Sequence, residues 1–251
     1  PDFTCVYFQN VRLLLAGARK NLLAASGIIY EHRPTWGGVY GILFHMKVLI
    51  LNGSPHVEGN VSVAIAELVK TFSADGVESE VVNVGSQSIS GCRACYACGK
   101  LGKCAIDDAV NATAAKFAAA DGLVVASPVY YASPNGTLVS FLDRLFLSAK
   151  FDKRMKVGAS VAVARRGGCS ATFDMLNKYF TISGMPVASS QYWNSVHGCA
   201  PGEAAQDEEG LQTMRTLARN MSFLMKSIAL GREKFGLPAA EAPVKTSFIR
   251  K

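Results

Sequence analysis

Short apolar segments alternate with longer amphipathic segments from Met46 onward, and this alternation limits the fold more than any other feature. Strands are expected over 47–52, 79–84, 121–127, 156–164 and 186–190. Helices are expected over 61–74, 108–119, 136–149, 170–182 and 207–229, the last of them stopping at Gly231. The run 122–126 is apolar throughout, as in strands covered by helices on both faces. Five strand–helix units predict a doubly wound five-stranded parallel sheet in three α/β/α layers.

The chain is expected to divide at Met46, its first methionine. Residues 1–45 show no comparable alternation, and we interpret them as an upstream extension of the reading frame or a loose tail. A targeting presequence is a second interpretation, disfavoured because no small-residue cleavage pattern follows a continuous apolar core. One domain is expected over 46–235, followed by a loose C-terminal tail over 236–251.

Composition and charge exclude several classes of protein. A hydrophobic content of 49% with 18% charged residues describes a globular chain. No apolar run reaches the ~18 residues of a membrane span, so no membrane partner is expected. The formal charge is +7, but the basic residues are scattered, which argues against nucleic acid and suits an anionic cofactor. Four of the seven cysteines crowd between Cys92 and Cys104, which favours a metal or redox site in a reducing, cytoplasmic compartment.

The first expected strand runs into a polar loop over 52–62 that is suited to phosphate. Gly59 allows a tight turn before the following helix, whose first amides favour an anion. Side-chain donors are available from Ser54, Asn60 and Ser62. The alternative is an ordinary polar connection, since the loop has neither a dinucleotide fingerprint nor a P-loop.

Gly-Ser-Pro-x-x-x-Gly-Asn after an N-terminal strand resembles the flavodoxin-like NAD(P)H-dependent FMN reductase family. The resemblance implies a flavodoxin-like fold and an FMN phosphate held by Ser54, Asn60 and nearby amides. His56 stands where arginine is common in the family, and Val61 stands where a hydroxyl residue is common. Backbone donors and Ser62 are therefore expected to carry more of the binding.

Three later loops are expected to reach the flavin. The third strand ends in a rigid, proline-rich turn whose residues would border the ring, namely Pro128, Val129, Tyr130 and Tyr131. The fourth strand ends in residues that would offer amides and positive charge to the flavin edge, namely Arg165, Arg166 and Gly167. In the family that the chain resembles, the loop after the fifth strand approaches the flavin, so the resemblance implies Trp193 at the flavin face or a subunit interface, with His197 as a weaker proton-donor candidate. The alternatives are tyrosines that cap the core and arginines that are only solvated. By the same resemblance, Asp143 and Arg144 would be structural.

Cys92-x2-Cys95-x2-Cys98-x5-Cys104 is the most informative motif. Four thiols in a loop that is otherwise rich in basic residues and glycine are poorly explained by core packing. Soft thiolates at this spacing suit an iron–sulfur cluster or zinc. Zinc sites more often use two well-separated pairs of cysteines. A loop that binds no metal is a further alternative. Cys5, Cys169 and Cys199 are interpreted as incidental.

With the following Ile106-Asp107-Asp108, this motif resembles the iron–sulfur flavoproteins of anaerobic microbes, over about residues 46–230. The resemblance implies a 4Fe–4S cluster on Cys92, Cys95, Cys98 and Cys104, next to FMN. The predicted function is an oxidoreductase that passes electrons from NAD(P)H through FMN to an unidentified small-molecule or protein acceptor. One alternative is a non-enzymatic carrier that takes electrons from ferredoxin; another is a flavin-binding or zinc-stabilised regulatory module. A homo-oligomer, dimer or tetramer, is expected.

Overall fold

The central strand β1 (Met46–Asn52) shows why this sequence forms a two-faced sheet. Val48, Leu49, Ile50 and Leu51 are all fully buried. Because side chains alternate along a strand, Val48 and Ile50 join one hydrophobic cluster while Leu49 and Leu51 join the other. Such a strand is stable only between two helical layers. In the computed structural model the described residues are 45–244, 246 and 248.

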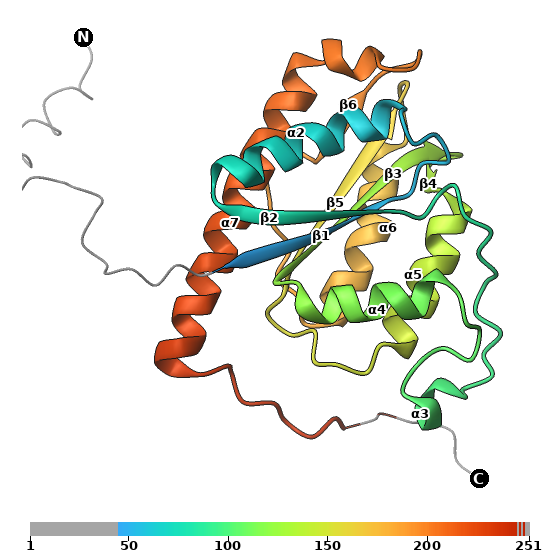
Figure 1. Ribbon diagram of the computed structural model, residues 1–251, viewed down its shortest axis with the longest axis vertical. Coiled ribbons are helices and arrows are strands. Elements are labelled where there is room, and N and C mark those ends of the chain that lie inside the picture. Colours follow the sequence, from blue (N-terminus) through green and yellow to red (C-terminus); the bar gives the residue numbers. More distant parts are fainter. Residues whose placement is uncertain (1–44, 245, 247, 249–251) are drawn as a thin grey trace, which may run out of the picture. The chain divides into compact units, whose positions relative to one another are not determined.

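The main sheet is parallel, with strand order β2-β1-β3-β5-β6, and β4 adds an antiparallel pair to β3 (Figure 1). Besides β1, the strands are β2 (Val77–Asn83), β3 (Gly122–Tyr130), β4 (Ser133–Pro134), β5 (Val157–Ala164) and β6 (Ser195–His197). This is the order of flavodoxin-like doubly wound sheets. The predicted fold class is confirmed.

Helices cover both faces of the sheet (Figure 1). They are α2 (Asn60–Ala74), α3 (Cys98–Leu101), α4 (Ala109–Ala119), α5 (Gly136–Ser148), α6 (Cys169–Ile182), the short 3-10 helix η1 (Glu203–Gln206) and α7 (Glu208–Phe235). Buried side chains of α2 and α7 pack with one face of β1, and those of α4, α5 and α6 pack with the other. The three α/β/α layers are therefore confirmed. Among the helices of the described residues, none is both long and apolar enough to cross a membrane.

The expected fifth strand over 186–190 is wrong. Within it, only Val187 forms a bridge, to Gly158, and the last strand of the sheet is β6. Pro186 has no amide hydrogen, and its carbonyl instead accepts from the Gly158 amide (2.8 Å). The polar residues that follow have no apolar alternation to extend the pairing, so the strand ends after one bridge.

The expected end of the last helix at Gly231 is also wrong. Helix α7 continues through Gly231 to Phe235 and ends at Gly236, whose φ is 74°. A helix tolerates an internal glycine at a cost of ~1 kcal/mol, whereas the backbone of Gly236, at φ 74° and ψ 180°, is essentially confined to glycine. The expectation for 1–45 lies, apart from His45, outside the described residues. After Gly236, residues 237–244 form neither helix nor strand.

Candidate functional site

The loops that follow β1, β3 and β5 surround a cavity of about 800 Å³, here called the loop cavity. Parallel strands place these loops at the same edge of the sheet, beside the point where the strand order reverses. Eight of the residues expected from the sequence line the cavity: Ser54, His56, Gly59, Asn60, Pro128, Val129, Tyr130 and Arg165. Ligand cavities commonly measure about 300–1,000 Å³, so this one is large enough for a mononucleotide-sized cofactor.

Buried Asn52 organises the first loop. Its Oδ1 accepts from the Ser54 amide (3.0 Å), and its Nδ2 donates to Ser62 Oγ (3.2 Å) and Asn83 Oδ1 (3.1 Å). Ser54 Oγ in turn accepts from the His56 amide (3.1 Å). Ser62 therefore braces the loop from behind and is not part of the cavity wall.

The beginning of α2 faces the same cavity. Among the described residues no side chain caps this helix, whose N-cap is Gly59. The first amides of a helix have no partner within it and favour an anion. His56 and Arg165 supply cationic or donor groups to the wall, while Glu58 supplies an opposing charge. This donor set fits a phosphate-bearing ligand.

Asn60 connects α2 to the loop after β6, here called the 198–204 loop. Asn60 Nδ2 donates to the Ala200 carbonyl (2.9 Å), and Asn60 Oδ1 accepts from the Ala204 amide (3.0 Å). Both polar atoms of this side chain are thus used within the protein. Asn60, which was expected from the sequence to hold phosphate, is therefore seen to clamp the neighbouring loop.

Glu203 closes the 198–204 loop from within. Its Oε2 accepts from the amides of Ala200 (2.8 Å) and Cys199 (2.5 Å), and these hydrogen bonds hold the pKa of Glu203 below its ordinary value. The loop adds wall residues that the sequence analysis did not single out: Gly198, Cys199 and Pro201. They were missed because the last strand was expected at 186–190. The turn-forming Gly198–Gly202 stretch would have been the signal, had the strand been placed correctly.

The end of β3 pairs with β4 in a small antiparallel hairpin. Ser127 Oγ accepts from the Asn135 amide (2.9 Å), and Asn135 caps α5 by accepting from the amides of Thr137 and Leu138. Tyr130 lines the loop cavity, whereas Tyr131, at a φ of 51°, is fully exposed and does not. The hairpin therefore presents one of its two tyrosines to the cavity.

Arg166, Gly167 and Trp193 do not line the loop cavity either. Trp193 is 54% exposed and contacts Tyr192 in a tilted arrangement, with ring centroids 5.1 Å apart. His197, expected in a loop, lies in β6, and its amide donates to Asp207 Oδ2 (2.6 Å). Arg165 is thus the member of the arginine pair that the structure places at the cavity.

A second cavity, of about 260 Å³, is lined by all four cysteines of the motif and is here called the cysteine cavity. Cys92 and Cys95 are exposed, Cys98 is buried at the start of α3, and Cys104 is half-buried. The backbone between the first three cysteines turns through left-handed residues, Ala94 (φ 49°) and Tyr96 (φ 55°). These turns let side chains three residues apart share one cavity.

Arg144, from α5, also lines the cysteine cavity, and its side chain is only 1% exposed. Its Nε and Nη2 lie 3.3 Å from Cys104 Sγ, while Nη1 and Nη2 donate to the two carboxylate oxygens of Asp108 (2.6 and 2.9 Å). Burial tends to raise the pKa of Asp108, but hydrogen bonds from Arg144 and the Val110 amide outweigh it and lower the pKa. Arg144 was expected to be structural, and its contact with Cys104 of the cysteine motif was not predicted from the sequence.

The cysteine arrangement bears on which metal it could hold. Among the described residues, no group of three or more His, Cys, Asp or Glu side chains is arranged around one metal-ion position. A single zinc ion needs its ligands at about 2.0–2.3 Å from one point. All four thiols line one cavity, and soft thiolates are ligands both of zinc and of iron–sulfur clusters.

Comparison with solved structures shows the fold. The structure of RosB with a bound riboflavin-phosphate intermediate matches with a TM-score of 0.59 and 19% identity, over 82% of this chain and 94% of RosB. The NAD(P)H:quinone oxidoreductase of Methanothermobacter marburgensis matches with a TM-score of 0.56 and 17% identity, over 70% of this chain and 97% of that one.

Sequence comparison shows the family. An iron–sulfur flavoprotein of Methanocaldococcus jannaschii is 33% identical over 73% of this chain and 99% of its own length. An iron–sulfur flavoprotein of Methanosarcina thermophila is 30% identical over 75% of this chain and 100% of its own length. The model of the NADPH-dependent FMN reductase family matches residues 46–198. The chain therefore belongs to the NADPH-dependent FMN reductase family, as a flavodoxin-like flavoprotein oxidoreductase.

Proposed function

We propose that this protein binds FMN in the loop cavity and passes electrons from NAD(P)H to an acceptor, with a 4Fe–4S cluster on Cys92, Cys95, Cys98 and Cys104. The observation that carries the proposal is the convergence of three strand-end loops and the uncapped start of α2 on one cavity, within the described residues. The four cysteines around a second cavity support the cluster.

Each wall of the loop cavity has a distinct task. Ser54, His56 and the first amides of α2, next to Gly59, hold the phosphate, because helix-terminal donors and a basic side chain favour an anion. The apolar surfaces of Pro128, Val129 and Tyr130 exclude water from the ring. Arg165 offers a cation that stabilises negative charge on the ligand. When bound, FMN would supply the redox chemistry for electron transfer from NAD(P)H.

Purification without oxygen tests both halves of the proposal. Flavin and iron are quantified per chain, and the flavin absorbance is followed after addition of NADH or NADPH. Bound FMN that bleaches rapidly with either nucleotide supports the oxidoreductase. Protein that is colourless and does not take up added FMN contradicts it, and protein free of iron after anaerobic reconstitution contradicts the cluster.

A carrier without its own NAD(P)H activity is the second candidate, because Cys92 and Cys95 are exposed and a cluster there would be open to a partner protein. The cluster would supply one-electron transfer. Reduction by reduced ferredoxin, with no bleaching by NADH or NADPH, would select this function over the first.

We further propose a homo-oligomer in a reducing, cytoplasmic compartment. The exposed aromatic side chains Tyr131 and Trp193 support an interface, since large exposed aromatics are typical of contact surfaces. Light scattering after gel filtration should give a multiple of the 26.7 kDa chain mass. A mass of one chain at micromolar concentration contradicts this expectation.

A further inference from the structure

Arg144 is committed almost wholly to the cysteine loop. Besides Cys104 and Asp108, its guanidinium donates to the carbonyls of Ser90 (3.3 Å) and Ile106 (3.1 Å). A buried arginine needs such partners, because an unpaired charge away from water is costly. A purely structural ion pair with Asp108 would not require two nitrogens directed at a sulfur atom.

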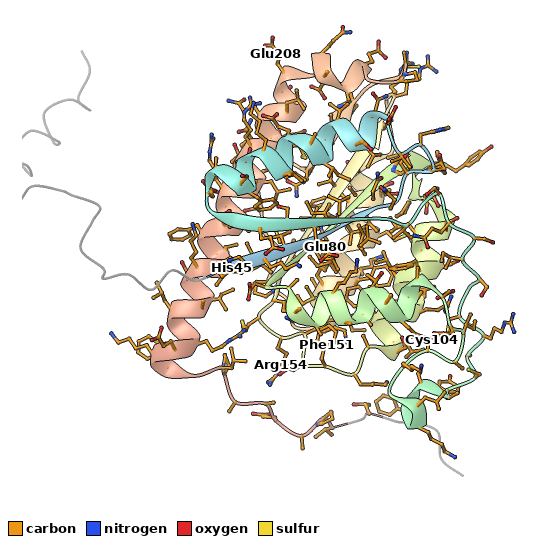
Figure 2. The ribbon with its side chains drawn as sticks, viewed as in Figure 1. His45, Glu80, Cys104, Phe151, Arg154 and Glu208 are labelled. Atoms are coloured by element: carbon orange, nitrogen blue, oxygen red, sulfur yellow. The ribbon has the colours of Figure 1, made fainter. Side chains whose placement is uncertain are left out.

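The backbone of Cys104 is held at both its amide and its carbonyl by one side chain. Its amide donates to Asn111 Oδ1 (3.0 Å), and its carbonyl accepts from Asn111 Nδ2 (3.1 Å). Asn111 belongs to α4, so the backbone of Cys104 is fixed to a helix at one end of the loop (Figure 2). Arg144 contacts the sulfur of Cys104, so both the backbone and the side chain of Cys104 are held in place at the cavity wall. Cys92 and Cys95, by contrast, are exposed.

We propose that Arg144 positions Cys104 and raises the reduction potential of the 4Fe–4S cluster. This inference rests on the cluster of the proposed function. One-electron reduction adds one negative charge to a cluster, and donors to its sulfur ligands stabilise that charge. The Asp108 carboxylate offsets the net charge of Arg144, so the effect comes mainly from hydrogen bonding to Cys104. The Nε–H group is directed at the sulfur, and Nη2 is shared among Cys104, Ile106 and Asp108, all from a buried arginine side chain.

The test is a redox titration of anaerobically purified protein, with dithionite as the electron donor and the reduced cluster followed by electron paramagnetic resonance. Arg144→Lys keeps the charge but loses the planar guanidinium with its several N–H donors, and Arg144→Gln loses both the charge and the guanidinium. At a fixed solution potential, the ratio of reduced to oxidised cluster should fall about tenfold in either variant, a shift of about 59 mV for one electron. Arg154→Gln is the matched control, since Arg154 pairs with Asp152 on the surface, well apart from Cys104 (Figure 2).

Asp108→Asn independently tests the direction of the shift in reduction potential. It also covers the case in which the Arg144 variants do not fold. Asparagine still caps α4, as Asp108 does by accepting from the Val110 amide (3.1 Å). It removes the charge that offsets Arg144, so the potential should rise.

Each outcome of these measurements decides something. Variants that hold full iron at the wild-type potential, or a lower potential in Asp108→Asn, overturn this inference alone. A wild-type protein that takes up no iron overturns the cluster itself, and this inference with it, while leaving FMN binding intact.

Discussion

Replacing Asn60 with alanine should loosen a wall of the loop cavity. The change removes two hydrogen bonds that tie the start of α2 to the 198–204 loop, one to the Ala200 carbonyl and one from the Ala204 amide. That loop supplies Cys199 and Pro201 to the wall. FMN would then have to order the loop as it binds, which lowers its affinity.

The magnitude follows from the two contacts. A neutral hydrogen bond contributes about 0.5–1.5 kcal/mol net, and these two lie partly in solvent, so the loss should be about 1–2 kcal/mol. Because 1.4 kcal/mol corresponds to tenfold in affinity, the dissociation constant for FMN should rise about 5- to 30-fold. Quenching of FMN fluorescence by the apoprotein measures this constant directly.

A double-mutant cycle with Glu203→Gln separates the clamp from a direct phosphate contact. Glu203 holds the same loop through the Cys199 and Ala200 amides, so the two changes should couple by at least about 0.5 kcal/mol. Asn220→Ala is the control, because Asn220 also ties a helix to a loop, by donating to the Ser189 carbonyl. The reasoning is refuted if Asn60→Ala leaves the affinity unchanged, or if its effect and that of Glu203→Gln simply add.

Three further predictions concern pH and backbone packing. Because amide hydrogen bonds from Ala200 and Cys199 lower the pKa of Glu203 from 4.5, its hold on the loop is complete above that value and is lost as the pH falls through the lower folded pKa. FMN retention should decline over that acid range, and identical fluorescence profiles for wild type and Glu203→Gln would contradict the assignment. Gly85→Ala should destabilise the protein by about 1–3 kcal/mol in urea unfolding, since a Cβ there would collide with the Gly53 backbone; an unchanged midpoint would count against this packing. Gly231→Ala should stabilise α7 by about 0.5–1 kcal/mol, because a Cβ there meets no atom within 4 Å among the described residues; a lower melting temperature would contradict it.

The central strands were predictable because their pattern is set by burial alone. β1, β3 and β5 lie between two helical layers, so each reads as a short apolar run, and the structure places them within a few residues of the expected bounds. The loops that follow these strands could be named for the same reason. Once a doubly wound sheet is predicted, its carboxyl edge holds the site.

The edge of the sheet was not predictable in the same way. β6 has three residues and buries one of them, Val196, so its sequence carries no strand pattern. Its place is decided by pairing with β5. Tyr131 and Trp193 were likewise expected to border the flavin because they are aromatic, yet neither of them lines the loop cavity.

By itself, the sequence determined the layered fold, the phosphate-suited loop and the cysteine motif, because each depends on residues that are close together along the chain. Only the tertiary structure decided that Asn60 clamps a loop 140 residues away and that Arg144 reaches Cys104 across 40 residues. Such contacts join residues that are far apart in the sequence and meet only in the folded chain. Local patterns of polarity and spacing therefore do not predict them.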